Sequence, residues 1–386
     1  MKYSFKSNQL KTSNVNLLYR ISYTALCILG VLLGVIIFQQ VFINHYDILF
    51  SVLIISVSYV VAVGFIGKLS TLFFSWYKSN HNLITLLYFI SLSLIAFNLV
   101  ITAIIADIKI NDRPHQVEQF VGGTEDLDAG KYAVLDITYN ISSILSFVSI
   151  WITTALLMYN YRNKLINSIV YWTVLSIPLI YFLVIYFYQF IFGNLLSSYL
   201  AVDPITVSIL LTAFLSLSKP IGGVTFALAF WKISQSVGYE KNLKNYMVIS
   251  GWGILLIFGA DQALVQTLTP YPPFGLATIT VLPIAALCML LGIYNSATLV
   301  STNSNLRRSI YKYALQSKLL GQIGQAEMQN ELQKTAEELM RRTHELETNT
   351  QMHIELDENE LKNYIRLVIS EVKKANKPNT DLGNAA

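Results

Sequence analysis

Long apolar runs separated by short polar connections dominate the first 300 residues of the chain. A bilayer with a hydrocarbon core of about 30 Å needs about 20 mainly apolar residues in each helix that crosses it. Eight segments meet this requirement, and they cover residues 20–43, 48–67, 83–106, 133–159, 165–192, 205–231, 246–268 and 275–300. The pattern predicts an all-α fold, with a polytopic bundle of about eight transmembrane helices over residues 1–300 and a cytoplasmic helical tail over residues 301–386.

The composition favours a membrane protein over a soluble domain. Hydrophobic residues make up 54% of the chain and charged residues only 13%, and the mean hydropathy is +0.50, whereas soluble domains carry about 25% charged residues. The first apolar run is too long for a signal peptide and no cleavage site follows it, so we expect an uncleaved first span. Cys27 and Cys288 both fall in apolar runs and are expected to be unpaired thiols.

Lysine and arginine alternate between the connections in the way that the positive-inside rule describes. The connections on one side carry Lys2, Lys6, Lys11, Arg20, Lys68, Lys78, Arg162, Lys164, Lys232, Lys241 and Lys244. The opposite connections NHYDI, GNLLSSYLAVDP and TPYPPFG contain neither residue type. The alternation predicts that both termini are cytoplasmic, and it supports a count of eight because one span more or fewer would break it.

The longest connection, residues 107–132, is expected on the outer side and is net acidic. Its stretch GGTEDLD clusters carboxylates but lacks the ligand spacing of a dedicated calcium loop. We therefore interpret it as a solvated acidic loop. It is also the largest outer surface that the sequence predicts.

The sixth span contains an unusual group, Lys219, Pro220, Gly222 and Gly223. An ionisable side chain inside a membrane indicates a functional site by default, because burying a charge in lipid is costly. Pro220 lacks a backbone N–H, and the two glycines permit a close approach between helices. Two interpretations stay open: a kinked packing interface that directs Lys219 to an inner cavity or cytoplasmic water, or a ligand or coupling site.

The seventh span contributes Asp261 and Gln262. Because the sixth span runs inward and the seventh outward, Lys219 lies about 22 Å and Asp261 about 12 Å below the outer surface, at about 1.5 Å per residue. An ion pair between them is therefore not implied by the spacing. Gln262, Gln266 and Asn98 are candidates for a polar pocket around Asp261, or for hydrogen bonds between helices.

Motifs for common chemistry are missing from the sequence. All five histidines lie outside the predicted spans, so no intramembrane pair is placed to hold a haem or a metal. The motifs HExxH and GxSxG and the P-loop do not occur. The sequence predicts a protein that is not an enzyme, with no catalytic residue, no metal, no cofactor and no nucleic-acid partner.

Beyond residue 301 the chain becomes polar and predicts a long helix, with Ser304 or Asn305 as its cap. A weak coiled-coil seam runs along it through Leu332, Ala336, Leu339, Thr343 and Leu346, after a less regular stripe of Leu319, Leu320, Ile323 and Met328. Residues 306–372 are thus expected to bind a cytoplasmic protein, a second copy of the chain, or the second tail helix.

That second tail helix begins at a capping box of Asp357 and Glu360 and ends before Pro378. Its apolar face consists of Leu361, Tyr364, Ile365, Val368 and Val372. A short amphipathic helix needs a partner surface. Its mixture of acidic and basic residues disfavours docking on a membrane surface.

The stretch RRTHELETNT around His344 resembles the phospho-acceptor box of sensor histidine kinases. The resemblance covers about five residues, with a histidine followed by an acidic residue and a leucine, and it implies a phosphorylated His344. Asn349 stands where that family has a proline, and the tail is too short for its ATP-binding domain. A solvated histidine on a charged helix is the preferred interpretation.

A wider resemblance is carried by the stretches SKPIGG, SGWGILLIFGADQALV, PYPPFGLATI and LRRSIYKYALQSKLLGQIGQAEMQNELQ. Through them, residues 205–375 resemble a family of uncharacterised polytopic membrane proteins of ammonia-oxidising archaea. The sensor-like layout of some relatives implies signalling, although the resemblance supplies no site residues.

Three functional hypotheses follow. The first is an integral membrane receptor or sensor-like protein, embedded in membrane lipids, that passes a signal to a cytoplasmic partner through its tail. The second is a transporter or channel with a site near Lys219 and Asp261. The third is a non-catalytic accessory subunit of a membrane complex.

Overall fold

The computed structural model describes most of the chain as helix, and no strand occurs among the residues that it describes. These are residues 2–43, 48–112, 133–159, 171–184, 214, 217–236, 240–260, 276, 278–303, 306–307, 310 and 318–350. The labelled helices are α1 (Lys2–Ile43), α2 (Ile48–Asn80), α3 (Leu83–Asp112), α4 (Ala133–Tyr159), α8 (Ser218–Ser236), α9 (Lys241–Ala260), α12 (Leu282–Thr302) and α14 (Lys318–Thr350).

Six helices in the described chain are long and apolar enough to cross a membrane. They cover Arg20–Gln39, Leu49–Asn80, Leu83–Ile108, Ile137–Tyr159, Lys241–Ala260 and Thr278–Thr302. This arrangement is compatible with a multi-pass membrane protein. The other two predicted spans are described only in part: 165–192 as the shorter apolar helix Tyr171–Val184, and 205–231 mainly as α8. The polar residues of α8, including Lys219 and Lys232, keep it out of the apolar set.

Two helices continue beyond the predicted spans, because hydropathy marks the bilayer and not the end of a helix. The second span was expected to end at residue 67, but α2 continues to Asn80, so Lys68 and Lys78 lie within the helix. At about 1.5 Å per residue, its 33 residues extend about 50 Å, well beyond the hydrocarbon core. The outer loop was expected from residue 107, but α3 continues to Asp112.

The start of the tail also differs from the prediction. The carboxamide Oδ1 of Asn303 accepts a hydrogen bond from the backbone N–H of Leu306 at 3.1 Å. This is the pattern of a helix N-cap, so Asn303 caps the next helical segment, whereas Ser304 and Asn305 lie outside the described residues. Within the described residues, the long tail helix α14 covers Lys318–Thr350.

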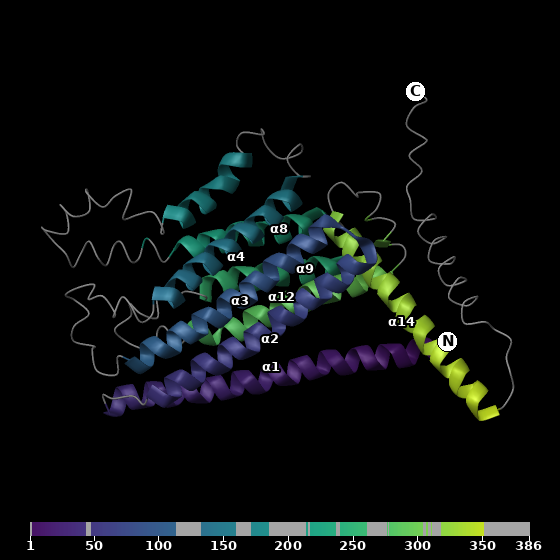
Figure 1. Ribbon diagram of the computed structural model, residues 1–386, viewed down its shortest axis with the longest axis horizontal. Coiled ribbons are helices and arrows are strands. Elements are labelled where there is room, and N and C mark those ends of the chain that lie inside the picture. The colour runs from purple at the N-terminus through teal and green to yellow at the C-terminus, as the bar shows by residue number, and fades with distance from the viewer. Residues whose placement is uncertain are drawn as a thin grey trace, which may run out of the picture.

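The main helices lie side by side as a bundle (Figure 1). Their contacts form a closed ring, in which α2 contacts α3, α3 contacts α4, α4 contacts α8, α8 contacts α9, α9 contacts α12, and α12 contacts α2. Helix α1 packs outside the ring against α2 and α12, and α14 contacts α12, α2 and α3. In Figure 1 the yellow C-terminal half of α14 extends away from the bundle.

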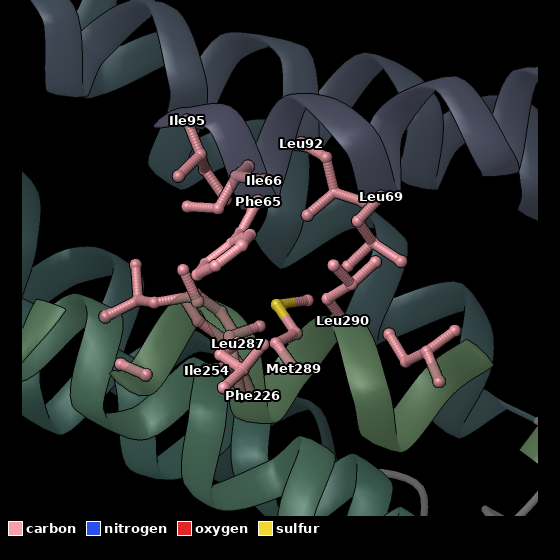
Figure 2. Packing of buried hydrophobic residues seen from close by; sticks show 14 of the residues in the cluster. Phe65, Ile66, Leu69, Leu92, Ile95, Phe226, Ile254, Leu287, Met289 and Leu290 are labelled. Atoms are coloured by element: carbon pink, nitrogen blue, oxygen red, sulfur yellow. The ribbon is translucent and has the colours of Figure 1, made fainter. Parts of the chain in front are cut away.

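The centre of the ring is filled by apolar side chains from all sides (Figure 2). The close-up shows Phe65, Ile66 and Leu69 of α2 with Leu92 and Ile95 of α3 facing Phe226 of α8, Ile254 of α9 and Leu287, Met289 and Leu290 of α12. Most of these side chains are fully buried. A dry, packed centre leaves the polar features of the bundle at its two ends and between neighbouring helices.

Candidate functional site

The helix that carries Lys219 is interrupted just before it. Phe214 is helical, Leu217 forms a turn, and α8 begins at Ser218. Pro220 therefore lies in the first turn of α8, where a missing backbone N–H is tolerated. The backbone N–H of Ile221 donates to the carbonyl of Leu217 at 3.0 Å and continues the helix from there.

The ammonium of Lys219 lies against Tyr139 of α4. Its Nζ donates to the hydroxyl of Tyr139 at 3.4 Å and lies 5.4 Å from the centre of the same ring. The side chain of Lys219 is only 9% exposed. Tyr139 lies six residues, about 9 Å, from the first residue of α4, so the charge lies in the half of the bundle nearer that end and not at its middle.

Gly222 and Gly223 bring α8 into close contact with a different helix on each side. A Cβ on Gly222 would overlap the edge of the Phe147 ring on α4. A Cβ on Gly223 would lie 3.0 Å from Cβ of Phe258 and 3.2 Å from the carbonyl of Leu255 on α9. The glycine pair thus allows α8 to fit between α4 and α9.

The contact at Gly223 also shows where Lys219 lies along the length of α9. The two helices are antiparallel, because Trp231 Nε1 donates to the carbonyl of Val248 at 3.4 Å, far from Leu255 along α9. Lys219, one turn before Gly223, therefore lies level with the end of α9 at Ala260. The depth expected from residue counting assumed a continuous helix from residue 205, and the break at Leu217 removes that assumption. Asp261 and Gln262 follow Ala260 but lie outside the described residues.

An aromatic cluster lies where the first turns of α8, which follow Lys219, pack against α4 and α9. The Phe147 ring stacks on Phe182 with centroids 3.9 Å apart and meets Phe226 and Phe258 edge-on at 5.3 Å and 5.9 Å. These four rings come from α4, the helix Tyr171–Val184, α8 and α9. Edge-to-face contacts of this kind add to the stabilisation from apolar burial. The first turns of α8 are therefore packed against aromatic side chains of the neighbouring helices.

Two further glycines bring α9 and α12 together. A Cβ on Gly253 would lie 2.6 Å from the backbone nitrogen of Met289, and a Cβ on Gly292 would lie 2.6 Å from the carbonyl of Tyr246. Real Cβ atoms do not approach backbone atoms so closely. Only glycine at these two positions permits the observed distance between α9 and α12.

The tail helix α14 packs against the C-terminal end of α12. A Cβ on Gly324 of α14 would overlap the side chain of Val300 on α12. Three residues later in α14, Trp76 Nε1 of α2 donates to the Glu327 carboxylate at 2.8 Å. Trp76 is fully buried and Glu327 is 8% exposed. The bundle therefore holds a buried carboxylate of the tail at this end.

Amide and hydroxyl groups extend this junction. Asn330 Nδ2 donates to the hydroxyl of Ser75 at 2.9 Å, and the hydroxyl of Ser79 donates to Asn330 Oδ1. Asn80 Nδ2 donates to the carbonyl of Gln322 at 3.5 Å. Side-chain hydrogen bonds thus link α2 to α14 at this junction, whereas the centre of the ring is apolar.

The remaining predicted site residues behave as follows. Asn98, a candidate for a pocket around Asp261, accepts a hydrogen bond from the hydroxyl of Ser142 at 2.9 Å and thereby links α3 to α4. His344 lies within α14, but its side chain is not among those described. The described residues contain no cluster of three or more histidine, cysteine or acidic side chains that could hold a metal.

Comparisons with protein-family models, with curated proteins and with solved structures find no match for this chain. Its function is therefore argued from the geometry of its own residues.

Three residues of these sites were missed by the sequence analysis: Tyr139, Trp76 and Glu327. Tyr139 lies on α4, 80 positions from Lys219. Trp76 and Glu327 are 251 positions apart, and neither belongs to a motif. The available signal was the pair of glycines in the polar tail beside the stripe from Leu319 to Met328, because glycine in a helix often marks a close contact.

Proposed function

We propose that the chain is an integral membrane receptor or sensor-like signalling protein that passes a signal through its tail helix. The observation that carries this proposal is the placement of α14. Its first half is buried against α2 and α12, and its second half leaves the bundle as part of the same 33-residue helix. A continuous helix is stiff on this scale, so a displacement of the docked half also moves the projecting half.

A chain of tight interfaces supports transmission to α14. Helix α8 meets α9 at Gly223, α9 meets α12 at Gly253 and Gly292, and α12 meets α14 at Gly324. A Cβ would be tight at Gly223 and would overlap its neighbours at Gly253, Gly292 and Gly324. Closely packed interfaces shift between discrete arrangements more readily than they deform. The proposed coupling therefore runs from Lys219 to the tail by packing alone.

The proposal includes eight spans with both termini cytoplasmic. Besides the six apolar helices, α8 supports a crossing because Lys219 contacts Tyr139 near one end of α4, whereas Phe230 contacts Tyr88 near the start of α3. The helix Tyr171–Val184 supports another, because Trp151 Nε1 of α4 donates to the carbonyl of Leu175 at 2.7 Å. The resemblance to archaeal membrane proteins with a sensor-like layout is consistent with this proposal.

Co-purification of the intact chain in mild detergent tests the signalling role. We expect a specific cytoplasmic protein, or a second copy of the chain, to co-purify and to be lost from the double variant Leu339→Asp and Leu346→Asp. Lys334→Gln, at an exposed position of the same helix, serves as the control and should retain the partner. Absence of both a specific partner and self-association would reject the proposal.

A transporter is the second candidate, favoured by the interrupted helix at Lys219. Broken helices whose N-termini carry the binding site are typical of secondary transporters. Solute flux in proteoliposomes that disappears in Lys219→Ala but persists in Lys232→Ala would support this function over signalling. A stable complex with no ligand response would instead indicate an accessory subunit.

A further inference from the structure

The docked half of α14 is polar for a helix that is buried. Leu319, Leu320, Ile323 and Ala326 form its apolar face, and all four are buried. Glu327 and Gln329, on the same stretch, are also more than nine-tenths buried. A helix that belongs permanently to a core carries apolar residues at such positions, so this composition needs an explanation.

Two buried amide atoms in this stretch have no hydrogen-bond partner, Oε1 of Gln322 and Nε2 of Gln329. A buried polar atom without a partner opposes burial, because the same atom is hydrogen-bonded when it is exposed to water. Gly321 and Gly324 also lower the intrinsic helix propensity of the segment. The unpaired amide atoms and the two glycines therefore reduce the stability of the docked state.

Four side chains on the last two turns of α2 form hydrogen bonds with the segment. Trp76 donates to Glu327, Ser75 and Ser79 pair with Asn330, and Asn80 donates to the carbonyl of Gln322. Among these contacts, the Trp76–Glu327 bond is the one that joins two buried side chains. Loss of either partner leaves the other buried without this hydrogen bond, which is costly.

The helix leaves the bundle directly after these contacts. Leu332, Gln333, Lys334 and Thr335 are exposed, and Figure 1 shows the rest of α14 projecting past the bundle. A partner bound to the projecting half can therefore pull or rotate the docked half without touching the bundle.

We propose that residues 318–330 form a releasable latch, held closed by the hydrogen bond from Trp76 to Glu327. In the closed state the latch covers the inner ends of α2 and α12. In the open state Trp76 and Val300 lose their contacts with α14, while the ring of helices stays intact. The purpose of the latch rests on the proposed signalling role, but the opening of the latch is measured without any partner.

Hydrogen–deuterium exchange of the full chain in lipid nanodiscs tests the latch. In the native protein, backbone amides of residues 318–330 should exchange at least tenfold faster than those at the centres of α9 and α12. Glu327→Ala should accelerate exchange of the latch a further tenfold or more. Glu327→Gln, whose side-chain oxygen still accepts a hydrogen bond, should have a smaller effect, and α9 and α12 should not change in either variant.

Trp76→Phe keeps an aromatic ring and removes the N–H donor. It should accelerate exchange of the latch as Glu327→Ala does, and the double variant should exceed neither single variant by more than about threefold, as expected for two residues that share one interaction. Lys334→Gln is the control and should leave exchange of the latch unchanged.

Two results would overturn the latch. One is exchange of residues 318–330 as slow as that of α12 in the native protein, because α14 would then open only with global unfolding. The other is acceleration of α9 and α12 together with the latch in every variant. A latch that opens in a protein with no tail partner would leave this inference standing and remove the signalling role, so the two failures are distinguishable.

Discussion

His81 and Asn82 close the turn between α2 and α3. His81 adopts a φ of 46°, in the left-handed region, and its backbone N–H donates to the carbonyl of Tyr77 at 2.7 Å. Oδ1 of Asn82 accepts from the backbone N–H of Ile84 at 2.8 Å and caps α3. This turn directly follows Ser79 and Asn80, which hold α14, so its geometry also positions the tail junction.

His81→Gly should leave stability within about 1 kcal/mol of the native protein, because glycine adopts a positive φ without strain. His81→Val should destabilise by about 1–3 kcal/mol, since a β-branched residue is strained in that region. Thermal unfolding of the full chain in detergent measures both variants. Equal melting temperatures for the two would show that the turn does not constrain this residue.

Asn98 and Ser142 provide a second prediction at the residue scale. Their hydrogen bond of 2.9 Å links α3 to α4 in a buried position. Interhelical hydrogen bonds in membrane proteins contribute about 0.6 kcal/mol on average and at most about 1.7 kcal/mol. A double-mutant cycle with Asn98→Ala and Ser142→Ala should therefore give a coupling free energy in that range, and a value near zero would count against the contact.

At the scale of whole helices, glycines determine how closely α9 and α12 approach. The hypothetical Cβ atoms of Gly253 and Gly292 meet backbone atoms, which cannot rotate away as a side chain can. A substitution there must separate the two helices along their length. Glycines that face open space, such as Gly64 and Gly67 on α2, carry no such constraint.

Gly253→Ala and Gly292→Ala should each destabilise the protein by about 1–3 kcal/mol, the usual effect of overpacking. The matched controls Gly64→Ala and Gly67→Ala add the same methyl group without a clash and should be neutral or slightly stabilising. Melting temperatures of the four variants in one detergent make the comparison. Equal losses at all four positions would indicate a backbone effect and not helix packing.

At the scale of the whole molecule, the proposed eight spans predict that the connections alternate between the two sides of the membrane. In a background with Cys27→Ser and Cys288→Ser, we expect Ser197→Cys and Tyr271→Cys to react with an impermeant thiol reagent from outside the cell. Asn163→Cys and Glu240→Cys should react only after permeabilisation, because the positive-inside rule predicts a cytoplasmic position for both. Inside labelling of Ser197→Cys would reject the count of eight spans.

Much of the candidate site lay beyond what the sequence could predict. The charge of Lys219 and the proline and glycines beside it were recognisable, because each departs from the surrounding apolar pattern. The partner Tyr139 was not, since tyrosine is common in membrane helices and nothing local links it to a residue 80 positions away. The same holds for Trp76 and Glu327.

The sequence by itself determined the helical class and the approximate positions of six apolar helices. It could do so because the backbone of an apolar run of about 20 residues must satisfy its own hydrogen bonds inside a membrane, and a helix achieves this within a single segment. The tertiary structure decided which helices are neighbours, where α2 and α3 end, and that half of a polar tail helix is buried against the bundle. These features depend on the fit between particular side chains far apart in the chain, such as Val300 against Gly324, and hydropathy does not encode that fit.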